Sequence, residues 1–283
     1  MRVFVTGATG YIGSHVARAL YGAGHDILAL AHHADARAAL AAAGYDTVPG
    51  DLADPEGLAA VVAGVDGVVH AANTNGEDAG EVDDAAVRAM VEALEGSGKP
   101  FVYTSGIWVL GETGEAAADE RSPTDPLALV AWRGPLESWL IEAADRGVRT
   151  IVIRPGIVYG DGGGIPALLA AGELPVVGDG ENRWPLVHVR DLARLYVNAL
   201  AEAPAGAILH GISETVKQKD VGERLGAEAM PLAEAREELG DFADALALDQ
   251  HITAPRTREL LGWEPREPGI LDVQEEALAG CAG

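Results

Sequence analysis

Three glycines separate the first apolar run of the chain from a stretch with helical periodicity. Val3–Thr6 is short and rich in β-branched residues, which is typical of a buried strand. The residues that follow read TGATGYIG, from Thr6 to Gly13. Glycines at 7, 10 and 13 suit a tight turn, a close approach of an anion to the backbone, and close packing of a helix on a strand. This order predicts a seat for the pyrophosphate of a dinucleotide at the free N–H groups of a helix start. The candidate contacts are Gly7, Thr9, Gly10, Tyr11 and Ile12.

Short apolar runs alternate with Ala-rich stretches of helical length through the first 155 residues. Such runs, bounded by Gly and Pro, suit buried parallel strands. Repeated strand–helix–strand units predict an α/β fold, a doubly wound parallel sheet of Rossmann type. Asp54-Pro55-Glu56 predicts a helix start, with Asp54 as the cap. The expected strands are Val3–Thr6, Ile27–Ala31, Thr47–Val48, Gly67–Ala71, Phe101–Thr104 and Thr150–Ile153.

The pattern changes after Tyr159, where glycine-rich turns interrupt it. Arg190–Ala201 has helical spacing, and residues 231–262 are expected to be mainly helical. We therefore expect a dinucleotide-binding domain over residues 1–158. A small mixed C-terminal substrate lobe is expected over 159–283, with 187–211 returning to the sheet.

The composition excludes several partners. Acidic residues number 44 and basic residues 20, and the resulting net charge of −24 repels nucleic-acid phosphates and anionic membranes. The single cysteine, Cys281, allows neither an internal disulfide nor a Cys-based zinc site, and we find no metal-ligand spacing. The sequence has neither a signal-peptide pattern nor an apolar stretch of membrane-spanning length, so we expect a cytoplasmic protein without membrane partners.

Five segments together resemble the extended and atypical short-chain dehydrogenase/reductases, the NAD(P)-dependent epimerase/dehydratase family. They are TGATGYIG, Gly50-Asp51-Leu52, Val69–Ala72, Arg154–Gly160 and Val187–Ala193. The resemblance implies that Asp51 and Leu52 lie at the adenine, Ala71 and Ala72 at a ribose, and Pro155 and Ile157 at the nicotinamide end. It also implies a small organic substrate, and a homodimer formed through two helices, one of which would contain residues 127–146.

The cofactor is expected to be NADP or NAD. An acid at the end of the second strand would bind the ribose 2′-hydroxyl of NAD. That strand ends instead in His32-His33, and Asp35 comes later, where we expect it to cap the next helix. In similar proteins an Arg at the place of His32 faces the 2′-phosphate of NADP. We therefore favour NADP, with His32, His33 and also Arg37 as candidate contacts. The alternative is that both histidines are surface loop residues.

The proton-transfer pair that the resemblance implies is missing. Members of the family use a Tyr followed by Lys at the fourth position after it, together with a Ser or Thr near the fifth strand. None of the six tyrosines has such a Lys, and lysine occurs only at 99, 217 and 219. Matching the family pattern puts Leu129 at the Tyr place, Arg133 at the Lys place and Gly106 at the Ser place. Arg133 can still hold a ribose but cannot act as a base near pH 7.

Ser105 is the candidate catalytic residue because it lies one position before Gly106. Tyr103, Tyr159 and His188 are further candidate proton donors, and Trp132 and Trp184 are candidate pocket or core residues. Asp249–His251 is a polar run expected within the helical lobe.

Two functions remain open from the sequence. The protein is expected to be an oxidoreductase- or epimerase-like enzyme. Alternatively, it is a non-catalytic NAD(P) sensor that uses the cofactor to regulate a partner. A third interpretation is that the family pattern is matched to this sequence in the wrong register between Gly111 and Leu127. The sequence has no Lys between 100 and 216, so a shifted match would still lack the Lys partner of the Tyr.

Overall fold

The computed structural model describes residues 1–74 and 76–273, so Cys281 lies outside the described residues. The chain divides into two compact units. Unit 1 comprises residues 1–105, 135–153 and 193–208. Unit 2 comprises 106–134, 154–192 and the chain from 209 onward.

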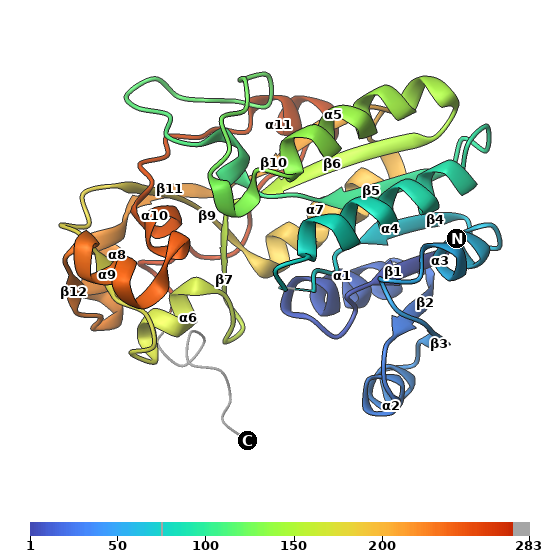
Figure 1. Ribbon diagram of the computed structural model, residues 1–283, viewed down its shortest axis with the longest axis horizontal. Helices are drawn as coiled ribbons and strands as arrows, with labels where there is room; N and C mark the ends of the chain where they lie inside the picture. Colours follow the sequence, from blue (N-terminus) through green and yellow to red (C-terminus); the bar gives the residue numbers. More distant parts are fainter. Residues whose placement is uncertain (75, 274–283) are drawn as a thin grey trace. The chain divides into compact units, whose positions relative to one another are not determined.

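The larger sheet has seven strands in the order β10-β6-β5-β4-β1-β2-β3 (Figure 1). Strands β1 to β6 pair with their neighbours in parallel, and the side chains of β1, β4, β5 and β6 are mostly buried, as strands covered on both faces require. The predicted Rossmann-type doubly wound sheet is therefore confirmed. The strands are β1 (Arg2–Thr6), β2 (Asp26–Ala31), β3 (Asp46–Pro49), β4 (Gly67–His70), β5 (Pro100–Thr104), β6 (Arg149–Pro155) and β10 (Ala207–Gly211).

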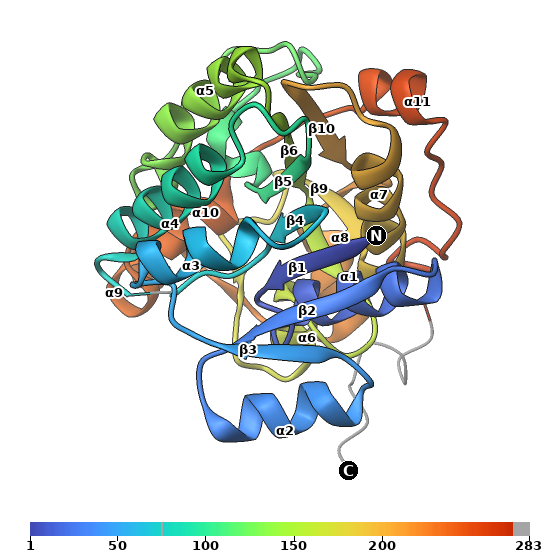
Figure 2. The same ribbon diagram turned by 90° about the vertical axis from the view of Figure 1, so that its right-hand side faces the viewer.

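Helices cover both faces of this sheet. Figure 2 shows α3, α4 and α5 side by side on one face, with α1 and α7 on the other. The predicted helix over Arg190–Ala201 is confirmed as α7. The helices are α1 (Tyr11–Gly22), α2 (Ala34–Ala42), α3 (Pro55–Val62), α4 (Ala79–Ala93), α5 (Arg133–Ala143), η3 (Ala144–Arg146) and α7 (Val189–Glu202).

The predicted helix caps have different outcomes. Asp54 caps α3 as predicted, because its Oδ1 accepts a hydrogen bond from the backbone N–H of Gly57 at 3.0 Å. The prediction that Asp35 caps α2 is wrong. The cap is His33, whose Nδ1 accepts from the backbone N–H of Ala36 at 3.1 Å, and Asp35 lies in the first turn of the helix. The acid still opposes the positive end of the helix dipole from that position.

Unit 2 contains small sheets and short helices. One sheet has the order β11-β9-β7, with β7 parallel and β11 antiparallel to β9, and β12 pairs with β8. The predicted mixed lobe is therefore confirmed in its fold class. Its elements are η1 (Ile107–Leu110), η2 (Ala128–Val130), β7 (Ile157–Tyr159), α6 (Ile165–Ala170), β8 (Val176–Val177), β9 (Arg183–His188), β11 (Glu214–Lys217), α8 (Gln218–Leu225), β12 (Ala229–Met230), α9 (Leu232–Leu239), α10 (Asp241–Ala247) and α11 (Pro255–Leu261).

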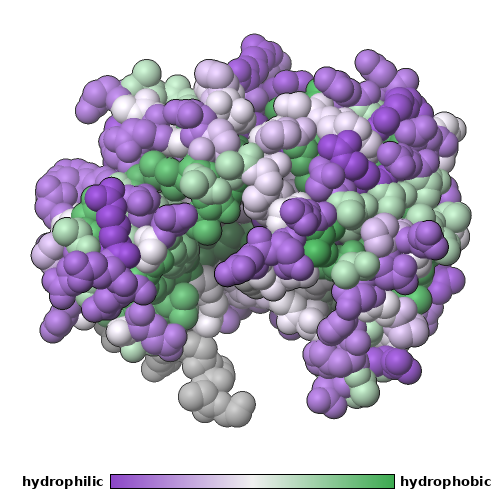
Figure 3. Space-filling model, in the orientation of Figure 1, coloured by the Kyte–Doolittle hydropathy of each residue, from purple (hydrophilic) through white to green (hydrophobic). Residues whose placement is uncertain are grey.

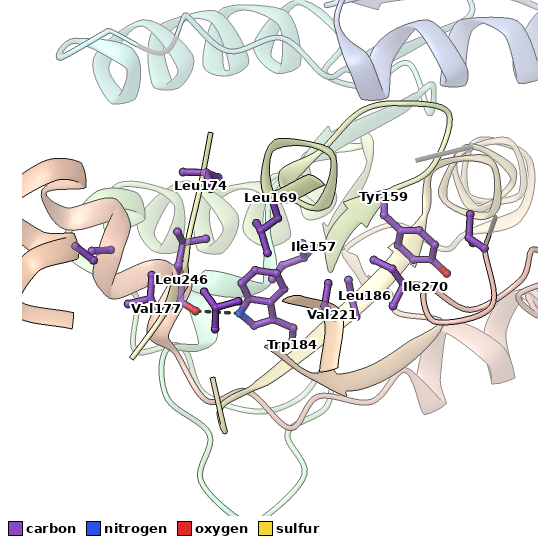
Figure 4. Close-up of a cluster of buried hydrophobic side chains, with 14 residues drawn as sticks. Ile157, Tyr159, Leu169, Leu174, Val177, Trp184, Leu186, Val221, Leu246 and Ile270 are labelled. Atoms are coloured by element: carbon purple, nitrogen blue, oxygen red, sulfur yellow. Dashed lines mark hydrogen bonds between the residues drawn. The ribbon is translucent and has the colours of Figure 1, made fainter. Parts of the chain in front are cut away.

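Trp184 belongs to the core of unit 2 (Figure 4). Its indole is fully buried among Ile157, Leu169 and Val221, and Nε1 donates to the carbonyl of Leu246 at 2.9 Å. Because the polar edge of the indole is satisfied inside the core, the core interpretation of Trp184 holds.

The expected helical stretch over 231–262 is interrupted. It forms α9, α10 and α11, but residues 248–254 lie outside these helices, and Ile252 forms a bridge with Ala118. The expectation that 231–262 is mainly helical is confirmed, and Asp249–His251 lies between α10 and α11 in this helical part of the lobe. The backbone of this segment pairs with a distant loop, and the buried Gln250 side chain donates to the carbonyls of Ile107 and Gly111 at 3.1 and 2.8 Å.

Hydrophilic side chains predominate on the face drawn in Figure 3, in keeping with the high net charge. Within residues 1–74 and 76–273, none of the helices combines the length and apolar content that a membrane span requires.

A buried polar cluster joins β10 to the segment before α11. His210 is fully buried; its Nδ1 donates to the carbonyl of Thr253 at 2.9 Å, and its Nε2 lies 3.5 Å from the Arg154 guanidinium. Burial lowers the pKa of His210 to about 4, and the neighbouring Arg154 cation acts in the same direction. The ring is therefore neutral in the folded protein near pH 7.

We expect His210 to make the protein less stable in acid. Its pKa is lower in the folded chain than in the unfolded chain, where it is about 6.5. As the pH falls from 6.5 to about 4, only the unfolded chain takes up this proton, so the free energy of unfolding decreases by up to about 3 kcal/mol. Urea unfolding of the wild type and of His210→Gln at several pH values measures this component. The variant should lose it, and parallel pH dependences in the two proteins would contradict the assignment.

Candidate functional site

The turn after β1 brings two strand ends into contact. Gly7 has a φ of +74°, a conformation that favours glycine, and a Cβ there would lie 2.6 Å from the carbonyl oxygen of Ala71. A Cβ on Gly13 would lie 2.0 Å from the carbonyl oxygen of Gly7. Side chains are therefore excluded at both positions, and α1 begins directly against the turn.

The start of α1 is suited to an anion. The cap residue is Gly10, which has no side chain to accept from the helix amides, and the described first turn contains no acidic residue. The backbone N–H of Gly10 donates to Gly7 at 2.9 Å, which fixes the turn. Uncapped amides and the positive end of a twelve-residue helix dipole bind phosphate well. The residues present therefore fit the pyrophosphate of a dinucleotide.

Most of the other predicted contacts in unit 1 follow the strands of its sheet. Because the carboxyl ends of parallel strands meet at one edge, these residues share the edge that carries the Gly7 turn. His32 follows β2, Asp51 follows β3, Ala71 and Ala72 follow β4, and Ser105 follows β5. Thr9 is exposed, Tyr11 and Ile12 open α1, and Leu52 is buried.

The end of β2 carries a contact between a histidine and a carboxylate that the sequence did not reveal. The Nδ1 atom of His32 lies 3.1 Å from a carboxylate oxygen of Asp51, and both side chains are largely exposed. His33 uses its Nδ1 as the cap of α2. The two histidines therefore have different local partners, and His32 is the one beside a carboxylate.

Ser105 has an unusual hydroxyl. The residue is 8% exposed, and its backbone N–H donates to the carbonyl of Ile153 at 2.8 Å. Within the described part of the chain, its buried Oγ has no hydrogen-bond partner. A buried hydroxyl without a partner costs about 1–3 kcal/mol, so it is uncommon unless a ligand or water completes it.

Two of the tyrosines considered as proton donors already form hydrogen bonds with other residues of the protein. The hydroxyl of the buried Tyr103 donates to Asp83 at 2.7 Å. The hydroxyl of Tyr159 lies 2.9 Å from both Glu214 Oε1 and the carbonyl oxygen of Pro268. Burial and the Glu214 carboxylate raise the pKa of Tyr159 far above its usual value. Both side chains therefore hold their own unit together.

The remaining candidates lie in unit 2. His188 is buried, which lowers its pKa, and its Nδ1 accepts from the backbone N–H of Arg190 at 3.2 Å. Arg133 opens α5, and its guanidinium carbon lies 4.3 Å from the centroid of the Trp132 ring, a cation–π contact that orients the charge. Pro155 ends β6 and Ile157 opens β7, and both are buried.

Asp83 is a buried acid that the sequence analysis did not single out. It lies on the apolar stripe of α4 that also contains Val87 and Met90, at helical spacing. An acid on such a stripe is the signal that could have found it, because buried carboxylates are rare without partners. Among the described residues, no group of three or more His, Cys, Asp or Glu side chains is placed to hold a metal ion.

This chain is similar in sequence to several known proteins. The family model described as "NAD dependent epimerase/dehydratase family" matches residues 3–210. An uncharacterized protein of Schizosaccharomyces pombe is 33% identical, covering 98% of this chain and 99% of its own length. A 2-alkyl-3-oxoalkanoate reductase of Stenotrophomonas maltophilia is 28% identical, covering 75% of this chain and 68% of the reductase.

A solved structure shows the same fold. It is a double mutant of the dTDP-glucose 4,6-dehydratase DesIV from Streptomyces venezuelae, solved with NAD bound. The TM-score is 0.79 at 21% identity, with coverage of 94% of this chain and 92% of the dehydratase chain. At this identity the likeness concerns the fold alone.

We expect Gly13→Ala to disrupt the turn. The added Cβ would overlap the Gly7 carbonyl, so α1 must move, which lowers the free energy of unfolding by about 2 kcal/mol or more and weakens dinucleotide binding. Gly22→Ala is the matched control in the same helix, where no described atom lies within 4 Å of the added Cβ. It should be neutral or stabilising by up to about 1 kcal/mol. Equal behaviour of the two variants in denaturant unfolding and calorimetry would refute the close approach as the cause.

Proposed function

Because this chain belongs to the NAD-dependent epimerase/dehydratase family, we propose that it binds NADP(H) or NAD(H) and transfers hydride to or from a small organic substrate. Unit 1 holds the cofactor at the carboxyl edge of its sheet, through the Gly7 turn and the start of α1. Unit 2 supplies substrate contacts. The bound nicotinamide supplies or accepts the hydride. The similarity to an oxoalkanoate reductase supports carbonyl reduction, or the reverse oxidation of an alcohol, as the reaction class.

The buried hydroxyl of Ser105 is the observation that carries this proposal. It follows β5 at the edge that carries the dinucleotide seat, and Oγ has no partner among the described residues. A substrate carbonyl or alcohol oxygen would complete its hydrogen bonding. Donation from Oγ polarises a carbonyl and stabilises the negative charge that develops on its oxygen.

Arg133 has a positioning role in the same proposal. Its planar guanidinium offers several N–H donors, which suits ribose hydroxyls, and stacking on Trp132 limits the directions in which it points. It holds positive charge and donates hydrogen bonds, without exchanging a proton near pH 7. The homodimer that the family resemblance implies is part of this proposal too, and α5 lies within the segment assigned to it.

Leu129 favours a second candidate function, a non-catalytic NAD(P) sensor. It lies in η2, is 40% exposed, and occupies the place that the family resemblance assigns to the catalytic Tyr. An alkyl side chain cannot transfer a proton. A sensor would bind reduced and oxidised cofactor with different affinities and show no turnover.

We expect Ser105→Ala to separate these functions. A screen of small ketones, aldehydes and alcohols with both nicotinamide cofactors first identifies a substrate by the change in nicotinamide absorbance. Loss of the hydroxyl should then lower kcat about 100-fold while the Kd of the cofactor stays unchanged. Ser213→Ala is the control, because that hydroxyl already donates to the carbonyl of Leu186. Tight cofactor binding without any turnover in the screen supports the sensor, and full activity of Ser105→Ala would exclude Ser105 from catalysis.

We expect His32 and Asp51 to set the cofactor preference in opposite directions. A ring N–H of the imidazole can donate a hydrogen bond to a 2′-phosphate, whereas the carboxylate beside it repels the phosphate. His32→Ala should lower the affinity for NADPH relative to NADH about five- to tenfold, and Asp51→Asn should raise it. His25→Gln, at the opposite end of the same strand, is the control. An unchanged NADPH-to-NADH ratio in both test variants, measured by calorimetry, would mean that the pair lies away from the 2′ position.

A further inference from the structure

A row of buried polar side chains crosses unit 1 directly before the dinucleotide seat. Thr6 pairs in register with His70 on the neighbouring strand, and His70 pairs with Tyr103 on the next. The three residues therefore lie level with one another near the carboxyl ends of β1, β4 and β5. Asp83 reaches this row from α4 and is only 4% exposed.

Asp83 joins the row into one hydrogen-bonded network. Its Oδ2 accepts from the Tyr103 hydroxyl and its Oδ1 is bonded to His70 Nε2, both at 2.7 Å. The other ring nitrogen of His70 lies 2.8 Å from the Thr6 hydroxyl. A hydroxyl can donate or accept, so this last contact persists whether or not the imidazole is charged. The His70 and Tyr103 rings stack at 6.0 Å with an interplanar angle of 9°.

Global stability alone is a weak reason for such a network. Removing a carboxylate from water is costly, and well-packed apolar side chains of similar volume often stabilise a core at least as well. A fully satisfied polar network instead specifies one relative position of the elements that it joins. Here those elements are three strand ends and one helix.

The network is connected to the dinucleotide seat through two peptide bonds. Thr6 directly precedes Gly7, and His70 directly precedes Ala71. The two following turns touch each other, because the backbone leaves no room for a Cβ between Gly7 and Ala71, and Ala71 N–H donates to the Thr6 carbonyl at 3.3 Å. A small displacement of either strand end would therefore move the seat.

We propose that Asp83 is a positioning residue for the cofactor, acting through His70, Thr6 and Tyr103. It fixes the ends of β1 and β4 and thereby the Gly7 turn. Through Tyr103 it also fixes the strand that ends at Ser105. This inference rests on the proposed cofactor function, and it assigns a role to side chains that do not themselves touch the cofactor.

Two nearly isosteric variants test the network. Thr6→Val removes the hydroxyl that contacts His70, and Tyr103→Phe removes the hydroxyl that donates to Asp83. Each has a matched control in unit 1. Thr150→Val removes a buried hydroxyl that donates to the Leu140 carbonyl at the amino end of β6, and Ser97→Ala removes a hydroxyl that donates to the Leu94 carbonyl before the amino end of β5. Urea unfolding measures the stability of all four variants, and calorimetry with NADPH and NADH measures the cofactor Kd.

We expect both test variants to raise the cofactor Kd about fivefold, the value of one buried hydrogen bond. The two controls should lose similar stability and keep the wild-type Kd. Once a substrate is known, Tyr103→Phe should also lower kcat because its strand carries Ser105, whereas Thr6→Val should change only the KM for the cofactor.

The outcomes distinguish the proposed cofactor function from the positioning role of Asp83. If the wild type binds neither cofactor, the proposed function fails. If the wild type binds and the test variants bind equally well, the positioning role is refuted. The positioning role is also refuted if test and control variants weaken binding in proportion to their loss of stability, because the network then acts only on the fold. Asp83→Asn, which retains the shape, should weaken binding more than either test variant wherever it folds.

Discussion

The structure of the dinucleotide seat depends on a backbone contact that excludes side chains. With a Cβ on Gly13, the start of α1 would overlap the Gly7 carbonyl, and with a Cβ on Gly7 the first turn would overlap Ala71. These two contacts draw the start of the first helix, the end of β1 and the end of β4 into one small region. The uncapped amides of α1 then point their partial charge at the sheet edge, where the other candidate residues of unit 1 gather.

The sequence predicted this framework because its determinants are local. Short β-branched runs, the glycine spacing and the Asp54-Pro55 start each act within a few residues, and all are present in the structure. Predictions failed where residues distant in the sequence determine the local structure, or where two neighbouring residues can both cap a helix. The segment around Gln250 is not helical because its backbone bonds to residues far away in the sequence, such as Ala118 and Arg183, beyond the range of helical periodicity. The cap of α2 was assigned to Asp35, a favoured capping residue, but His33 holds the position.

In the candidate site, too, some features follow from the local sequence and others depend on distant contacts. The residues after each strand could be named from the sequence, since the position of a strand end follows from its pattern. Whether a named side chain is available for a ligand depends on its neighbours in three dimensions. Tyr103 and Ser105 lie two positions apart and are both buried, yet the first has a carboxylate partner and the second has none among the described residues. The difference comes from Asp83, whose burial was visible in the sequence only as an acid on an apolar helix stripe.

The availability of hydroxyls also bears on how a proton could move without the usual Tyr and Lys pair. A guanidinium such as that of Arg133 is a poor base, and burial together with the Glu214 carboxylate holds the pKa of Tyr159 high. A serine hydroxyl is too weak an acid to form an alkoxide near pH 7 and too weak a base to keep an extra proton, but it can donate one hydrogen bond while it accepts another. It can therefore pass a proton between a substrate oxygen and water without carrying charge at any stage. Such a relay requires a hydroxyl whose bonds are not already fixed by the protein, and this is the property that distinguishes Ser105 from the two tyrosines.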